Sequence, residues 1–379
     1  MSYFTIHSII VLVFTLVILI IELYNLKSLK RLNKFAEPSV NPKISVLIPA
    51  RNEENNIRSC VESILNQDYQ NIEVIVLNDN SEDKTREILL DMSAKSEKLR
   101  FFDGDSKPVE WSGKHWACHQ LSKKASGELF LFIDTDTIHK PDTLKKAVSA
   151  LYTENTDLLS VIPKQIVGTW SEKLVIPIMP WSISSFIPIG IAHKSKSPSL
   201  SLTVGQFMLF RRNAYEQSGG HESIKTEILD DIPIGRLIKK SGFKWKIVDG
   251  TKNSSCRMYN NFKEVYNGFS RNLFCAFNYN IPVFLWVWIW LTAVFFQPII
   301  TISLFIFRIP IPTEALLINF LILILTIIQW SIAIVRFKFP IYLIFLYTFS
   351  IILVDIIAIR SMYQTLTGKV QWKGRKIER

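Results

Sequence analysis

The stretch Lys43–Glu54 reads KISVLIPARNEE, a short continuous apolar run that passes directly into a polar segment. Runs of this kind are typical of strands that are buried on both faces of a parallel sheet. Apolar residues then recur at helical spacing, at Ile57, Val61, Ile64 and Leu65. We therefore expect a strand over Lys43–Pro49 and a helix that opens within Ala50–Glu54, which together form the first half of a βαβ unit.

The strand pattern recurs downstream. Further strands are expected at Ile72–Leu77, Leu99–Phe102 and Leu129–Ile133, with a second helix at Lys84–Met92. The last of these strands leads directly into Asp134-Thr135-Asp136. Because open α/β sheets bind ligands at the carboxyl ends of their strands, we expect this acidic triplet at the ligand-binding edge of a mostly parallel sheet.

The composition divides the chain of 379 residues into membrane and water-soluble parts, because 48% of its residues are hydrophobic and 20% are charged. We expect a transmembrane anchor over 1–26, a globular α/β domain over 27–280, transmembrane segments over 281–360 and a basic tail over 361–379. Many Lys and Arg residues flank the apolar segments, so the net charge of +11 favours an anionic membrane surface over nucleic acid as the partner. The four cysteines have no CxxC spacing, and neither a zinc site nor a disulfide framework is indicated.

The apolar run Ile9–Leu23, with the flanking Phe4 and Ile6, reaches roughly the 20 residues that a spanning helix needs. It lacks the basic start and the small-residue cleavage site of a signal peptide, so we expect an uncleaved anchor. Basic residues follow it at Lys27, Lys30, Arg31 and Lys34. By the positive-inside rule they predict that the globular domain lies in the cytoplasm. Together with the apolar runs described next, they predict a multi-pass protein of the plasma membrane.

Three further apolar runs follow the globular domain, at Ile281–Phe307, Ala315–Val335 and Pro340–Ile359. Three crossings would place the basic tail outside, whereas the positive-inside rule places it inside. The number of spans therefore stays open. Within the globular part, Leu174–Ala192 is also apolar but is interrupted by three prolines and lacks a helical period. It is interpreted either as a buried loop or as a membrane-facing wall for an acceptor.

Two carboxylates one residue apart at a strand end, Asp134 and Asp136, can share a divalent cation such as Mg²⁺ or Mn²⁺ and bridge it to diphosphate oxygens. The triplet alone is a weak signal, since aspartates also cap helices and fill loops. Its position after a buried strand, and after two earlier strands that end in polar motifs, favours the metal site.

Four ordered motifs carry a resemblance to a known family. They are Pro49-Ala50-Arg51-Asn52-Glu53, Asn78-Asp79-Asn80-Ser81, Asp134-Thr135-Asp136 and Leu229-Asp230-Asp231. Together they resemble glycosyltransferase family 2, whose members have a GT-A fold and invert the configuration at the sugar carbon. The resemblance covers roughly Lys43–Arg271 and implies a nucleotide-sugar donor.

The resemblance also implies roles for individual residues. Pro49, Arg51 and Glu53 would line the nucleoside pocket, and Asp79 would contact the base or the ribose. Asp134 and Asp136 would hold the metal and the diphosphate. Asp231 would be the catalytic base, and Asp230 stands where the family more often has Glu.

Other motifs narrow the resemblance to a membrane branch. They are Trp111-Ser112-Gly113-Lys114, Gly219-Gly220-His221-Glu222, Cys256-Arg257-Met258-Tyr259 and Val370-Gln371-Trp372-Lys373-Gly374-Arg375. They are similar to those of bacterial carotenoid (4,4'-diaponeurosporenoate, staphyloxanthin-type) and hopanoid glycosyltransferases, which implies a lipid or isoprenoid acceptor. The QxxRW signature of processive synthases is absent, because Gly268-Phe269-Ser270-Arg271 stands in its expected place. We therefore expect the transfer of a single sugar, with UDP-glucose as the donor that the resemblance suggests.

Three further residues are candidates for the site. Lys114 and Arg271 could add positive charge beside the diphosphate, although each could also be a solvated or lipid-facing cation. His221 follows two glycines and could touch the acceptor from a flexible loop, or could simply be a turn residue. His115 and His119 lie four apart but lack a third ligand, so we expect them on a helix surface or lining a pocket.

Asp231 bears on the acceptor, because a hydroxyl profits from a base whereas a carboxylic acid is already ionised near neutral pH. A hydroxyl acceptor is therefore favoured. Two other classes remain as alternatives. A sugar nucleotidyltransferase would carry a Gly-rich loop after the first strand, where this chain has Ala50–Glu53. A non-catalytic membrane scaffold would be expected to lose its acidic residues, which are all present.

Overall fold

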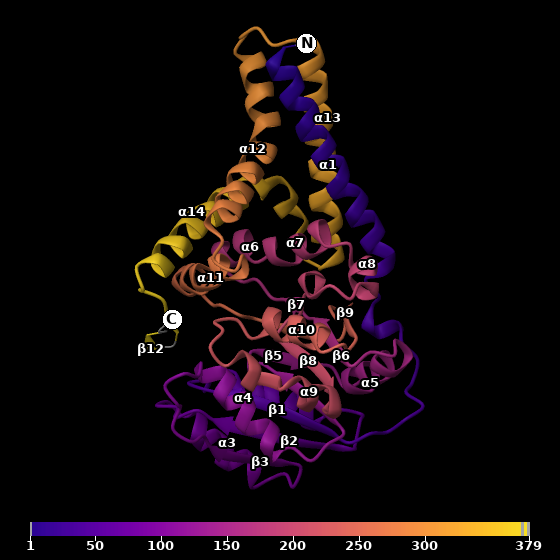
Figure 1. Cartoon of the computed structure of the whole chain (residues 1–379), viewed down its shortest axis with the longest axis vertical. Helices are drawn as coiled ribbons and strands as arrows, with labels where there is room; N and C mark the ends of the chain where they lie inside the picture. The colour runs from indigo at the N-terminus through magenta and orange to yellow at the C-terminus, as the bar shows by residue number, and fades with distance from the viewer. Residues whose placement is uncertain (1, 373–374, 377–379) are drawn as a thin grey trace. The chain divides into compact units, whose positions relative to one another are not determined.

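The computed structural model describes residues 2–372 and 375–376, so that residues 373–374 and 377–379 of the predicted basic tail lie outside the described part. The chain forms two compact units (Figure 1). The sheet unit comprises Leu29–Ile166 and Ile189–Met258, and the membrane unit comprises Met1–Ser28, Val167–Pro188 and Tyr259–Arg379. The membrane unit thus takes in a segment from the middle of the chain as well as both ends.

The sheet unit is built on seven strands in the order β3-β2-β1-β4-β8-β6-β9. Their bounds are Leu99–Asp103 for β3, Ile72–Asn78 for β2, Ile44–Ala50 for β1, Leu129–Ile133 for β4, Phe207–Arg211 for β8, Leu158–Ile162 for β6 and Trp245–Asp249 for β9. Strand β8 runs antiparallel to both neighbours, and the other described pairs in the sheet are parallel. The predicted α/β fold with a mostly parallel sheet is confirmed, and each predicted strand is present within one residue of its expected ends.

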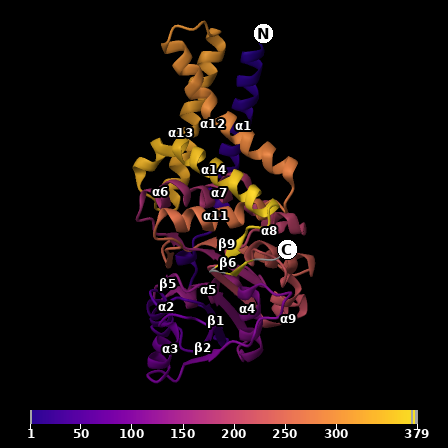
Figure 2. The ribbon, with the colours of Figure 1, turned by 90° about the vertical axis from the view of Figure 1, so that its left-hand side faces the viewer.

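Helices cover both faces of this sheet. Figure 2 shows α2 (Ile57–Leu65) and α3 (Thr85–Ser93) on one side, and α4 (Gly113–Lys124) and α9 (Arg212–Ser218) on the other. Alternate residues of β1, namely Ile44, Val46 and Ile48, are fully buried in one core with apolar residues of α2 and α5 (Thr143–Thr153). The residues of β1 that point to this face therefore pack against α2 and α5 and hold both helices against the sheet. A smaller sheet has the order β5-β10-β7, with bounds Thr137–His139, Ser254–Cys256 and Lys164–Gln165.

The first helix begins later than the sequence predicts. Helix α2 begins at Ile57, and the residues after Ala50 form a loop. The backbone N–H groups of Asn52 and Glu53 donate to Ser81 Oγ at 3.0 Å and to Thr85 Oγ1 at 2.7 Å. The hydroxyl groups of Ser81 and Thr85 thus accept hydrogen bonds from backbone N–H groups that would be unpaired in the first turn of a helix. These hydrogen bonds stabilise a loop where the sequence predicts a helical turn.

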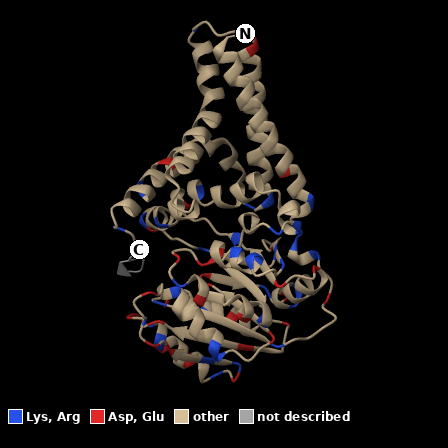
Figure 3. Ribbon diagram, in the orientation of Figure 1, with Lys and Arg blue, Asp and Glu red and all other residues tan. Residues whose placement is uncertain are grey.

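The membrane unit contains four helices that are long and apolar enough to cross a membrane. They are α1 (Tyr3–Ser28), α12 (Ile281–Ile306), α13 (Thr313–Arg336) and the run Ile341–Leu366, which joins η4 (Ile341–Leu346) to α14 (Tyr347–Leu366). All four predicted apolar runs are therefore helical, and Figure 3 shows α1, α12 and α13 almost without charged residues. The number of crossings and the cytoplasmic orientation stay predictions.

Polar side chains tie these helices together. Ser8 and Asn319 are fully buried, and Asn319 Nδ2 donates to Ser8 Oγ at 2.8 Å. Gln297 Nε2 donates to the same oxygen at 2.9 Å, and Gln297 Oε1 lies 2.6 Å from His7 Nδ1. Hydrogen bonds between membrane helices each stabilise packing by about 0.6 kcal/mol, so this network holds α1 against α12 and α13.

The apolar stretch Leu174–Ala192 is helical, which corrects the expectation of an irregular segment. It contains the end of α6 (Trp170–Val175), α7 (Ile178–Phe186) and most of α8 (Ile189–Lys194). Its prolines lie at or just inside helix starts, where a missing N–H removes no helical hydrogen bond. Within the membrane unit, Trp181 of α7 is buried and stacks on Trp330 of α13 with ring centroids 5.2 Å apart.

Candidate active site

An acidic cluster joins the end of β4 to the start of α10 (Asp231–Lys240). Asp134 and Asp136 follow β4 directly, as the sequence predicts. Lys114, in the first turn of α4, places its Nζ 2.6 Å from Asp134 Oδ1 and 2.7 Å from Asp230 Oδ2. Gly113 is the first residue of this helix, so Lys114 extends from a packed helix.

The carboxylates of Asp230 and Asp231 stand at a helix N-terminus, where negative charge is favoured. Asp231 Oδ1 accepts the backbone N–H of Ile232 at 2.7 Å. Gly205 packs against this pair: a Cβ at its position would lie 3.3 Å from Asp230 Oδ2 and 3.4 Å from Asp231 Cβ. The lack of a side chain at Gly205 therefore permits the close approach of its backbone to both aspartates.

The two neighbouring aspartates differ in protonation. Burial, followed by the charge of Asp230, raises the pKa of Asp231 to about 7. Burial also opposes the charge of Asp230, but Lys114 outweighs it and holds the pKa of Asp230 well below its ordinary value. One carboxylate of the pair therefore stays ionised, while the other can exchange a proton near neutral pH.

Asp136 carries the features of a cation ligand. Burial, then the charges of Asp134 and Glu53, raises the pKa of Asp136 to about 7. Its buried Oδ1 has no hydrogen-bond partner among the described residues. The described part of the chain holds no group of three His, Cys, Asp or Glu side chains arranged for a metal, so a cation held by Asp134 and Asp136 would take its remaining ligands from substrate oxygens or water. Mg²⁺ and Mn²⁺ suit such a donor set.

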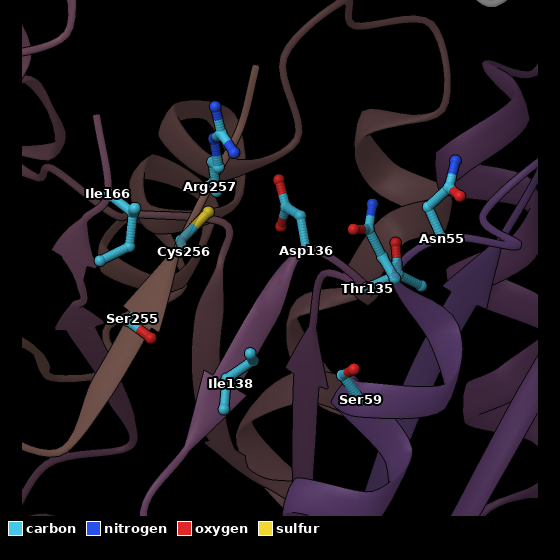
Figure 4. A pocket seen from close by; sticks show the side chains of 10 residues that line it. Asn55, Ser59, Thr135, Asp136, Ile138, Ile166, Ser255, Cys256 and Arg257 are labelled. Carbon is cyan, nitrogen blue, oxygen red and sulfur yellow. The ribbon is translucent and has the colours of Figure 1, made fainter. Parts of the chain in front are cut away.

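Asp136 points into a pocket of about 200 Å³ (Figure 4). The pocket is lined by Asn55, Asn56, Ser59, Thr135, Asp136, Ile138, Ile166, Ser255, Cys256 and Arg257. Figure 4 shows the Asp136 carboxylate between Arg257 on one side and Asn55 on the other. The lining of this pocket thus combines a carboxylate, a guanidinium and side-chain amides. Such a lining suits a ligand that carries both negative charge and hydroxyl groups.

The residues expected around a nucleoside lie at the ends of β1 and β2. Pro49 pairs with Leu77 across these strands. Arg51 and Asp79 are both buried, and Arg51 Nη1 donates to the backbone oxygen of Asp79 at 2.8 Å and lies 3.9 Å from Asp79 Oδ2. Glu53 follows on the same loop, close enough to Asp136 to raise its pKa.

His221 does not lie on a flexible loop, so of the two alternatives left open by the sequence the structure agrees with the turn residue. It belongs to η3 (Gly220–Ile224), is fully buried, and its Nδ1 lies 2.8 Å from Tyr215 Oη. Gly219 and Gly220 have positive φ angles of 85° and 50°, so these glycines build a tight turn. His221 therefore supports the core beneath the acidic cluster.

Arg271, His115 and His119 each have a different local environment. Arg271 belongs to α11 (Phe262–Ala276) of the membrane unit, where its Nε donates to Asn272 Oδ1 at 2.9 Å. His115 is buried with its ring 5.9 Å from that of His221, and burial lowers the pKa of His115 to about 4. His119 instead stacks on Trp116 on the same helix.

Sequence reasoning assigned no role to Gly205, Asn55, Asn56 or Arg257. Arg257 lies in a motif that the resemblance singles out, Cys256–Tyr259, but the motif alone does not say which of its side chains faces Asp136. The structure supplies that information: Arg257 N–H donates to Asp136 O at 3.2 Å, because β10 pairs with β5 just after the acidic triplet, and the side chains of both residues line the same pocket.

Comparison with known proteins agrees with this geometry. Residues 45–219 match the family described as Glycosyl transferase family 2. The chain is 25% identical over 279 residues to 4,4'-diaponeurosporenoate glycosyltransferase of Staphylococcus haemolyticus, covering 72% of this chain and 73% of that protein. It is also 25% identical over 239 residues to the protein of the same name from Staphylococcus aureus strain USA300, covering 61% of this chain and 60% of that protein, less than two thirds of its length.

A solved structure shares the fold along almost the whole chain. It is the mannosyltransferase PcManGT of Pyrobaculum calidifontis, in complex with GDP-Man and Mn²⁺, which is 16% identical with a TM-score of 0.56 and covers 96% of this chain and 99% of that chain. This likeness supports the predicted GT-A fold of the sheet unit. The chain therefore carries a glycosyltransferase family 2 domain over residues 45–219, and the relatives that it resembles are named as glycosyltransferases.

Proposed function

We propose that the protein is an inverting glycosyltransferase that moves one sugar from a nucleotide-sugar, with UDP-glucose as the expected donor, to a hydroxyl group of a membrane lipid or isoprenoid. One observation carries the proposal. Lys114 joins Asp134, which follows β4, to Asp230 at the start of α10, so the carboxylates suited to a metal diphosphate lie beside a pair suited to proton transfer.

Each side of the cluster has a chemical task. A Mg²⁺ or Mn²⁺ ion held by Asp136 and Asp134 would neutralise charge on the departing diphosphate. Asp231 takes the proton of the acceptor hydroxyl while the hydroxyl oxygen attacks the sugar carbon from the opposite face. The bond between that carbon and the diphosphate oxygen breaks, and the nucleoside diphosphate leaves. Lys114 and Arg257 provide positive charge for a phosphate group.

The donor's nucleoside is assigned to the ends of β1 and β2. There Arg51 and Asp79 hold each other in place, so the side chains that would contact a base or ribose are fixed before the donor arrives. The diphosphate would then lie along Asp134 and Asp136. GDP-Man and Mn²⁺ in the fold relative from Pyrobaculum calidifontis agree with a metal-bound nucleotide-sugar here.

The acceptor is assigned to the membrane. The chain carries four helices long and apolar enough to cross a bilayer, and the staphylococcal relatives are named for diaponeurosporenoate, a carotenoid-type carboxylate. For this chain we propose a hydroxyl acceptor at the cytoplasmic face, because a carboxylate needs no base and Asp231 has a pKa near 7.

The proposal is tested with membranes from cells that produce the protein. The membranes are incubated with UDP-glucose and Mn²⁺, and the lipids are then extracted and analysed by mass spectrometry. We expect one glycosylated lipid that is absent from membranes without the protein, and chelation of divalent cations should remove it. If no nucleotide-sugar is consumed under any metal condition, the chain is not a sugar transferase.

Replacing Gly205 with Ala should separate activity from stability. The new Cβ would lie 3.3 Å from Asp230 Oδ2, so the carboxylate must shift by a few tenths of an ångström. We expect transfer to slow roughly tenfold, because small misplacements of reacting groups have large kinetic effects. The melting temperature should change little, since Gly205 does not have a positive φ angle. Unchanged transfer would show that the position of Asp230 is not critical.

A further inference from the structure

One ammonium group lies between the two acidic motifs of the sheet unit. Lys114 Nζ is within 2.7 Å of an oxygen of Asp134 and of an oxygen of Asp230. An ammonium has three donors and no acceptor, so these two carboxylates satisfy most of what it can donate. In this arrangement Asp134 is paired with a cation that belongs to the protein itself.

The position of Lys114 is set by its helix. The next residue, His115, is buried with its ring 5.9 Å from that of His221. Ala117 and Cys118 of the same helix are also buried, and the side chain of Lys114 itself is only 25% exposed. Lys114 is therefore a half-buried residue whose position is fixed by a packed helix, unlike a mobile surface lysine.

This pairing conflicts with metal binding. A divalent cation approaches a carboxylate oxygen to about 2.1 Å, and two cations on one carboxylate repel each other strongly where water is largely excluded. Because Lys114 is held on Asp134 Oδ1, we expect a metal ion that binds the Asp134 carboxylate to displace Lys114 from it, while the pairing of Lys114 with Asp230 can remain. The ion pair between Lys114 and Asp230 then connects metal binding at Asp134 to the start of α10, which carries Asp231.

We propose that Lys114 is a built-in cation that occupies Asp134 in the donor-free protein, yields it when metal and donor bind, and keeps Asp230 in place throughout. It is a positioning residue that couples donor binding to the placement of the Asp230–Asp231 pair. The inference rests on the proposed function, because it takes Asp134 and Asp136 as the metal-side carboxylates.

The proposal predicts two effects of opposite sign. Without Lys114, a free divalent cation no longer competes with an internal charge, so its binding should tighten by roughly tenfold, in the usual range for coupling between two sites. Sugar transfer should instead slow, because Asp230 loses its partner. A lysine that served only to bind the donor's phosphate would leave metal binding in the absence of donor unchanged.

The test is a titration of the full-length protein in detergent with Mn²⁺ alone, in which electron paramagnetic resonance reports free Mn²⁺. The variants are Lys114→Met, Lys114→Gln and Lys114→Arg, with Lys124→Met as a matched control, since Lys124 is an exposed lysine in the last turn of the same helix. A double variant, Lys114→Met with Asp136→Asn, shows whether any gain belongs to this site.

We expect tighter Mn²⁺ binding in the Met and Gln variants, wild-type binding in the Arg and Lys124 variants, and loss of the gain in the double variant. Unchanged or weaker Mn²⁺ binding in both the Met and the Gln variants would overturn the role of Lys114. Failure of the wild-type protein to bind Mn²⁺ with or without a nucleotide-sugar would instead overturn the proposed metal-dependent function, and this inference with it.

Discussion

Replacing Asp231 with Asn should lower the rate of sugar transfer roughly 10³-fold, the usual contribution of a general base. The amide keeps the size of the side chain at the start of α10 and can still accept the N–H of Ile232, which Asp231 Oδ1 accepts at 2.7 Å. It cannot take a proton from the acceptor. The loss should therefore appear in kcat, with little change in the KM for the nucleotide-sugar.

The pH dependence provides a second reading of the same residue. Burial and the charge of Asp230 raise the pKa of Asp231 to about 7, and a base acts only when it is deprotonated. The wild-type transfer rate should therefore rise as the pH increases through about 7, and the Asn variant should lose this rise. A loss of less than about tenfold, with the pH profile unchanged, would contradict a base role and would favour an acceptor that is already ionised.

A surface carboxylate provides the matched control for this experiment. Asp91 lies on α3 in exposed ion pairs with Arg58 and Lys95, and such pairs contribute little to stability. Asp91→Asn should therefore leave both the rate and the pH profile at wild-type values. Equal losses in the two variants would point to a general effect of lost charge and not to proton transfer at Asp231.

Secondary structure could be predicted from the sequence where the local residue pattern matches the burial of the element in the fold. Strands such as Leu129–Ile133 are buried on both faces and therefore appear as continuous apolar runs, whose ends the structure reproduces. The start of α2 was not accessible, because the loop before Ile57 is held by side chains of the segment after β2. Contacts between segments far apart in the chain decide such boundaries, and no local pattern contains them.

Proline gave the wrong signal in Leu174–Ala192. Pro180 lies in the first turn of α7, where a helix tolerates proline, yet in the sequence it reads as an interruption. The period of the apolar residues is also obscured, since both α7 and its surroundings are apolar: Trp181 and Ile183 are buried within the membrane unit. Because Ser184 and Ser185 of α7 are buried as well, the helix shows no amphipathic pattern to recognise.

The candidate site shows the same division. Asp134 and Asp136 could be singled out because they follow a buried apolar strand, and Asp231 because its motif resembles one of the family's; their roles stay predictions. The contacts that these residues make could not be predicted from the sequence. Lys114 lies within 2.7 Å of both Asp134 and Asp230, and Gly205 packs against Asp230, only because the fold brings β4, α4 and α10 together.

Replacing Asp136 with Asn should abolish metal-dependent donor binding, with a loss of transfer of about 10³-fold or more, because a cation at a diphosphate contributes several kcal/mol to the transition state. The buried Oδ1 of Asp136 has no hydrogen-bond partner among the described residues, so it is available to a cation. Titration calorimetry with UDP-glucose and Mn²⁺ measures the binding directly.

Two comparisons keep this result specific. Asp136→Asn should not destabilise the protein, because burial beside Asp134 and Glu53 already disfavours its charge, as the raised pKa of Asp136 shows. The melting temperature without metal should therefore stay the same or rise. Arg257→Met, on the other wall of the pocket, should weaken binding of the nucleotide-sugar. It should not change the binding of Mn²⁺ in the absence of the donor. Full donor affinity in the Asp136 variant would mean that the diphosphate is held by cationic side chains and not through a metal.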